Sequence, residues 1–88
     1  MMTKKDIIAL IYAEVNRAKE KFPSWPTGWP NDLKRIEEAA IIAEEAGEVV
    51  KAALNMREGD PHTTTREEYY QEIVQTAAMC IRALERKP

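Results

Sequence analysis

The sequence predicts an all-α protein with three main helices in each chain, the second and third forming an antiparallel hairpin. Apolar residues recur at helical spacing through three long segments, and prolines and glycines gather in the two stretches between them. No segment alternates apolar and polar residues as a half-buried strand would. We therefore expect a single domain spanning residues 1–88.

The first helix is expected to begin at Thr3 and to end before Pro23. The Thr3 hydroxyl can cap the helix, and Asp6 completes a capping pair three residues later. Three prolines and a glycine within residues 23–30 forbid a continuous helix there. The apolar stripe of this helix consists of Ile8, Ile11, Val15, Ala18 and Phe22.

The second helix is the longest of the three. Asn31 or Asp32 can cap its start, and it is expected to run to about Met56, where a glycine and a proline soon follow as stop signals.

The third helix is expected to begin near Arg66 and to continue to roughly Arg86. Thr65 and Glu68, three residues apart, fit the capping box that marks a helix start.

The apolar faces of the second and third helices are too wide for a simple hairpin. On the second helix two neighbouring apolar stripes together cover about half of the circumference, at ~100° per residue. Three helices of one chain can hardly cover both faces, so we expect a homodimer or homotetramer built as an oligomeric helix bundle. The first of the two stripes contains Leu33, Ile36, Ala40, Ala43, Gly47, Val50 and Leu54.

Composition restricts the classes of partner. A formal net charge of −2 offers no basic field for a nucleic-acid polymer. The N-terminal apolar run, about seven residues long, is too short for a signal peptide or a membrane span. Cys80 is the only cysteine and cannot form an internal disulfide. We expect a cytoplasmic protein that binds neither a membrane nor a nucleic-acid polymer.

Acidic residues recur at matching heights on the second and third helices. Glu45 and Glu48 lie three residues apart on one, and Glu72 and Gln75 have the same spacing on the other. In an antiparallel hairpin Glu48 and Glu72 both lie about 11 Å from the turn, at ~1.5 Å per residue. If the two pairs face each other, they gather three carboxylates and an amide around one space.

Such a cluster of carboxylates requires a cation. Carboxylates held close together cannot all stay ionised unless their pKa values rise or a metal neutralises them. Hard oxygen ligands select Mg²⁺, with Mn²⁺ as the other candidate, and Mg²⁺ readily shares its coordination shell with substrate phosphates. The pattern therefore fits a metal site that binds a nucleotide, but a solvated acidic face is the ordinary alternative on an amphipathic helix, and taken alone the pattern favours it.

These residues resemble a known family. Glu44-Glu45-Ala46-Gly47-Glu48 followed by Glu72-Ile73-Val74-Gln75 is similar to the motif E-x-x-E and E-x-x-D of the MazG-like all-α nucleoside triphosphate pyrophosphohydrolases. The resemblance extends from about Trp25 to Leu84. It implies Mg²⁺-dependent cleavage of a (d)NTP to the monophosphate and pyrophosphate, in dimers or tetramers. It also implies metal ligation by Glu45, Glu48, Glu72 and the residue at position 75.

Position 75 departs from the family pattern. Gln75 offers a neutral carbonyl oxygen where the motif has Asp, and this removes one formal charge. The chain is then either an active hydrolase or a non-catalytic or weakly active nucleotide-binding or helical interaction module. In an active enzyme a water activated by the metal or a carboxylate attacks the α-phosphorus, with Glu44 or Glu45 as the candidate base.

Four further residues are candidates for substrate binding. Trp25 and Trp29 either stack on the nucleotide base or cap the small core. Lys51 and Arg82 lie one and two turns beyond the acidic positions, where they either contact phosphate or pair with a nearby Glu.

Overall fold

The chain folds into three α-helices. The computed structural model describes residues 2–23, 32–57, 60 and 62–85. The helices are α1 (Lys4–Lys21), α2 (Asp32–Asn55) and α3 (Arg66–Glu85). In the described residues the one β-type pairing is an isolated bridge between Met56 and Thr64. The prediction of an all-α, three-helix chain is confirmed, and none of the described helices is long and apolar enough to cross a membrane.

The predicted caps form at the starts of α1 and α3. The Thr3 hydroxyl accepts a hydrogen bond from the Asp6 amide at 3.1 Å, and an Asp6 carboxylate oxygen accepts one from the Thr3 amide at 3.0 Å. The Thr65 hydroxyl accepts from the Glu68 amide at 3.1 Å. Each cap satisfies an amide at a helix start that has no partner within the helix. The hydrogen bonds from Thr3 lower the pKa of Asp6, because they favour its ionised form.

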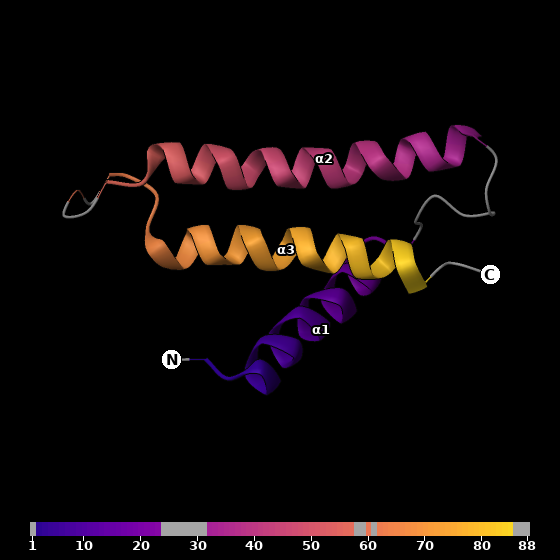
Figure 1. Ribbon diagram of the computed structural model, residues 1–88, viewed down its shortest axis with the longest axis horizontal. Helices are drawn as coiled ribbons and strands as arrows, with labels where there is room; N and C mark the ends of the chain where they lie inside the picture. Colours follow the sequence, from indigo (N-terminus) through magenta and orange to yellow (C-terminus); the bar gives the residue numbers. More distant parts are fainter. Residues whose placement is uncertain (1, 24–31, 58–59, 61, 86–88) are drawn as a thin grey trace.

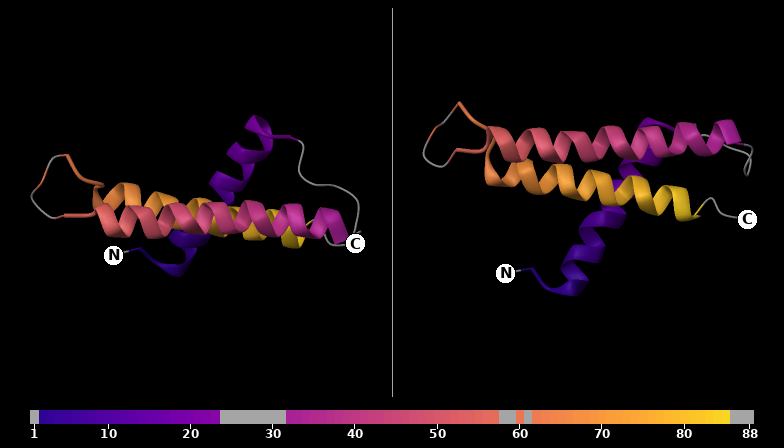
Figure 2. Two further views of the ribbon diagram at one scale, coloured as in Figure 1. Left: turned by 90° about the horizontal axis from the view of Figure 1, so that it is seen from above. Right: turned by 45° about the horizontal axis from the view of Figure 1, so that its top comes forward.

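The helix α3 lies at the centre of the molecule. Figure 1 shows α2 and α3 side by side, with the end of α2 and the start of α3 at the same end of the pair. The helix α1 packs against α3 and crosses it obliquely, as the views of Figure 2 also show. Both α1 and α2 therefore use α3 as their packing surface.

The core forms where α1 crosses α3, and side chains of α2 pack against it. Val15 is 1% exposed and Ala78 is fully buried, and Ala18 and Met79 complete the buried cluster. Only the middle of the predicted α1 stripe is buried, since Ile8 and Phe22 at its two ends are exposed. An oblique crossing explains the difference, because α1 meets α3 over a short length. The half-buried side chains packed on this cluster are those of Ile11, Ile41, Ile42, Ile81 and Ala83.

One apolar face of α2 is left open in the single chain. It is the first stripe predicted from the sequence, and Gly47 at its middle has no atom within 4 Å of the place where a Cβ would lie. We call this surface the outer face of α2. Its described side chains are all exposed, and its residues are Ile36, Ala40, Ala43, Gly47, Val50 and Leu54.

Candidate functional site

The acidic residues of α2 and α3 line two cavities about one helical turn apart. Glu48 and Glu72 line a cavity of about 120 Å³, which we call the Glu72 cavity. Glu45 and Gln75 line a second cavity of about 400 Å³, which we call the Glu45 cavity. The residue pairs that the sequence placed at equal heights thus share a cavity, but the four residues are divided between two.

The carboxylates interact electrostatically along this line. Burial raises the pKa of Glu45 above its usual value, and the negative charges of Glu72, Glu44, Glu48 and Glu14 raise it further, in that order. Acids from all three helices therefore act on one half-buried carboxyl.

The described residues contain no group of three His, Cys, Asp or Glu side chains close enough to hold one metal ion. The carboxylates that line the Glu72 cavity are those of Glu48, Glu68 and Glu72, although they do not gather closely enough to form such a group. Mg²⁺ is commonly bound through one or two carboxylates and completes its shell with waters and substrate phosphates. The donors present therefore fit an open Mg²⁺ site better than a closed cage.

The two predicted basic residues have different surroundings. Lys51 is exposed and lines the Glu72 cavity with Glu48. Arg82 is 6% exposed and donates hydrogen bonds to the carbonyl oxygens of Phe22 at 2.9 Å and Ala18 at 3.5 Å. Burial lowers the pKa of its guanidinium. Arg82 thus binds the C-terminal end of α1 while lining the Glu45 cavity.

The two tryptophans lie outside the described residues, so their roles stay predictions. Phe22, just before that segment, lines the Glu45 cavity together with Ile41 and Met79. These side chains give the cavity an apolar wall opposite its charged groups.

The sequence reasoning missed two residues of α1 that also line the Glu45 cavity, Glu14 and Arg17. Their spacing is that of an ordinary ion pair on a helix surface. Position in the sequence could have indicated that Glu14 is partly buried, because it directly precedes Val15 in the buried stripe and follows Ile11 by three residues.

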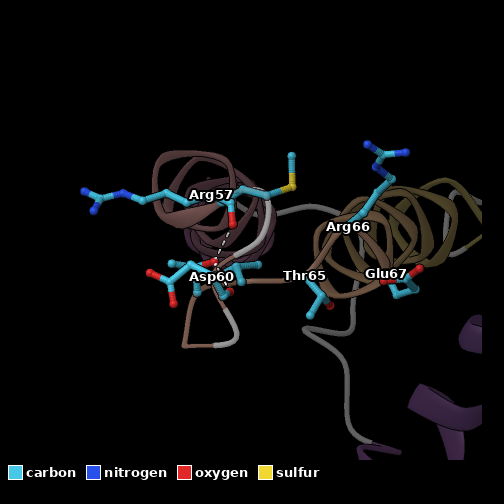
Figure 3. A pocket seen from close by; sticks show the side chains of 8 residues that line it. Arg57, Asp60, Thr65, Arg66 and Glu67 are labelled. Atoms are coloured by element: carbon cyan, nitrogen blue, oxygen red, sulfur yellow. Dashed lines mark hydrogen bonds between the residues drawn. The ribbon is translucent and has the colours of Figure 1, made fainter.

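A further cavity, of about 340 Å³, lies at the connection between α2 and α3 (Figure 3). The Thr63 hydroxyl donates to the carbonyl oxygens of Arg57 and Asp60, both at 2.9 Å. Figure 3 shows the side chains of Arg57 and Arg66, which both line this cavity, pointing in different directions. They therefore do not converge on an anion, and we leave this cavity outside the candidate site.

Comparison of the chain with protein-family models, with curated proteins and with solved structures found no match. The resemblance to the MazG-like pyrophosphohydrolases therefore rests on the motif residues of α2 and α3.

Proposed function

We propose that this protein is a Mg²⁺-dependent nucleotide pyrophosphohydrolase of the MazG-like type, which cleaves a (d)NTP to the monophosphate and pyrophosphate. The observation that carries the proposal is the pairing along α2 and α3, where Glu48 faces the same cavity as Glu72, and Glu45 the same cavity as Gln75.

In this proposal Glu48 and Glu72 would hold the metal together with Glu45 and Gln75, the other two ligands that the motif implies, which line the neighbouring cavity. Mg²⁺, or Mn²⁺ in its place, supplies charge neutralisation to the phosphates of the bound nucleotide. The side-chain oxygen of Gln75 can bind such an ion only as a neutral donor, so we expect weaker affinity than with Asp at this position.

The chain's own groups handle the proton. Glu44 and Glu45 both line the larger cavity and are the two candidates for the base. The base takes a proton from a water as its oxygen bonds to the α-phosphorus and the bond to the bridging oxygen breaks. Pyrophosphate leaves with the electron pair of that bond, and the nucleoside monophosphate remains.

The proposal extends to assembly and location. An antiparallel α2/α3 hairpin agrees with Figure 1, in which the end of α2 and the start of α3 lie together. Exposure of the outer face of α2 supports a homodimer or homotetramer in which a second copy covers it. We propose a cytoplasmic enzyme that acts on free nucleotides.

A helical interaction module with weak or no activity is the second candidate. The observation that favours it is the lack, within the described residues, of a three-carboxylate group suited to a metal. In that case the acidic surface binds a basic partner, and Gln75 reflects lost chemistry.

A direct assay separates the two candidates. The protein is incubated with a panel of (d)NTPs and Mg²⁺, and released pyrophosphate is measured for wild type, Glu48→Ala and Gln75→Asp. We expect Glu48→Ala to abolish activity and Gln75→Asp to preserve or raise it. Glu37→Ala is the matched control, because Glu37 also lies on α2 but pairs with Lys34 at 3.8 Å.

Two outcomes count against the enzyme. Activity that survives Glu48→Ala means that the site is misplaced. A melting temperature unchanged by millimolar Mg²⁺ or Mn²⁺, with and without nucleotide, together with no pyrophosphate release, favours the interaction module.

A further inference from the structure

The ion pair between Glu14 and Arg17 brings a cation from α1 to the Glu45 cavity. Arg17 Nε donates to both carboxylate oxygens of Glu14, at 2.8 and 3.1 Å, and Arg17 Nη2 donates to one of them. Two guanidinium nitrogens on one carboxylate fix the plane of the guanidinium group. The direction of this cation is therefore set by α1.

The pair differs from a solvated surface pair in its burial. The Glu14 side chain is 10% exposed, whereas that of Arg17 is 49% exposed. Both line the Glu45 cavity together with Glu44 and Glu45. The carboxylate is thus the more buried partner, and the guanidinium is half exposed to solvent at a cavity that both residues line.

Arg17 also interacts electrostatically with a carboxylate of α2. The pKa of Arg17 is raised first by the hydrogen bond that it donates to Glu14 and by the charge of that carboxylate, and then by the charge of Glu45. The guanidinium of α1 therefore lies close enough to the candidate site to interact with it.

The other cations near the site are less suited to a polyphosphate. Arg82 donates to main-chain carbonyls at the end of α1 and is buried. Lys51 lines the neighbouring Glu72 cavity, and Lys19 pairs with Glu85 at 3.1 Å on the surface. Arg17 has further N–H donors beyond those that Glu14 accepts, and a guanidinium matches the geometry of phosphate oxygens.

We propose that Arg17 binds a phosphate group of the nucleotide at the Glu45 cavity, with Glu14 as the positioning residue that holds it there. This inference rests on the proposed function. A polyphosphate placed beside Glu44 and Glu45 is repelled by their charges, and the Arg17 charge offsets this repulsion. The helix α1 is then part of the binding site as well as of the core.

The test measures binding without turnover. Calorimetry with Mg²⁺ and α,β-methylene dNTPs, which cannot be cleaved at the reacting bond, gives the dissociation constant for wild type, Arg17→Ala, Arg17→Lys and Glu14→Gln. The corresponding nucleosides are titrated in parallel. Lys19→Ala is the matched control, because it removes a cation of the same helix outside the cavity.

We expect Arg17→Ala to weaken binding of the triphosphate analogue about 10- to 100-fold, which is the range for the loss of a charge-assisted hydrogen bond. Nucleoside affinity should change less than about twofold, Arg17→Lys should recover part of the loss, and Lys19→Ala should have no effect. Glu14→Gln should weaken binding of the analogue in the wild-type background but not in the Arg17→Ala background, because Glu14 acts through Arg17.

If the wild type binds the triphosphate analogue and Arg17→Ala binds it equally well, this inference is overturned and the proposed function still stands. The same holds if Arg17→Ala weakens nucleoside and triphosphate equally, since the contact is then not with phosphate. If wild type binds no analogue at all, the proposed function fails and this inference fails with it.

Discussion

Arg82 ties the C-terminal end of α1 to α3. Its guanidinium donates to the carbonyl oxygen of Phe22, just after α1, and at 3.5 Å to that of Ala18, which also accepts a hydrogen bond from the Phe22 amide. A buried cation in this position satisfies groups that water otherwise reaches. The hydrogen bonds support a structural role, and contact with phosphate stays a prediction.

Replacing Arg82 should therefore destabilise the chain. We expect Arg82→Met to lower the free energy of unfolding by about 2–3 kcal/mol, because hydrogen bonds from a charged donor are lost and the Phe22 carbonyl loses its partner from α3. Urea unfolding of the metal-free protein measures the change. Arg57→Met is the control, since that side chain is exposed and should change stability by less than about 0.5 kcal/mol. An equal loss in both variants would contradict the structural role.

Glu45 should make stability depend on pH in the absence of metal. Its pKa is higher in the folded chain than in the unfolded one, so its ionised form disfavours folding. This contribution lowers stability as pH rises from the ordinary Glu value through the raised value, and it is relieved as pH falls.

Accordingly, Glu45→Gln should raise the melting temperature at pH 7 in EDTA and have little effect at pH 4. The gain should be below about 1 kcal/mol, because solvent screens a partly exposed carboxyl. Thermal unfolding followed by circular dichroism at the two pH values checks this. A melting temperature at pH 7 that falls on substitution would show that ionised Glu45 stabilises the chain.

At the scale of elements, Gly47 interrupts the outer face of α2 without a packing reason in the single chain. The open space around it means that an added methyl group meets nothing. If no helix of a second copy packs directly against Gly47 in the proposed oligomer, Gly47→Ala should stabilise the protein by about 0.5–1 kcal/mol, the usual gain in a helix interior. Denaturant unfolding measures it. A loss of stability would place a neighbouring helix of a second copy against Gly47.

The helix starts were predictable because caps are local. Thr3 with Asp6 and Thr65 with Glu68 satisfy amides within one turn, so neither depends on the rest of the fold. The oblique crossing of α1 was not predictable, because it depends on how side chains of different helices interlock. Sequence spacing thus gave the stripe around Val15 but not which part of it is buried.

In the candidate site, too, local spacing was predictable from the sequence and the packing between helices was not. The rise per residue was sufficient to match Glu48 with Glu72 and Glu45 with Gln75. It did not reveal that the pairs line separate cavities, which depends on side-chain direction. Glu14 was missed because only tertiary packing brings α1 to α2 and α3.

At the scale of the whole molecule, exposed apolar side chains point to self-association. Leu54 is 76% exposed, and Ile36 and Val50 on the same face of α2 are more than half exposed. A face of this kind is unfavourable in water and is typical of an interface.

We expect light scattering to give the mass of a dimer or tetramer at micromolar concentration. Val50→Lys together with Leu54→Lys should shift the mass toward the monomer, because two charges would be buried in the interface. The paired control is Ile7→Lys with Ile8→Lys on α1, where the exposed side chains belong to another surface. A monomeric wild type would contradict the oligomeric bundle.

The central position of α3 means that the three helices need not open together. The helix α1 is attached through its crossing with α3, so it can detach as a unit while α2 and α3 remain paired. Amide protons of α1 should then exchange with solvent through a smaller opening free energy than those of α3. Bound nucleotide held by Arg17 would penalise that opening, and slower exchange confined largely to α1 would report an occupied site.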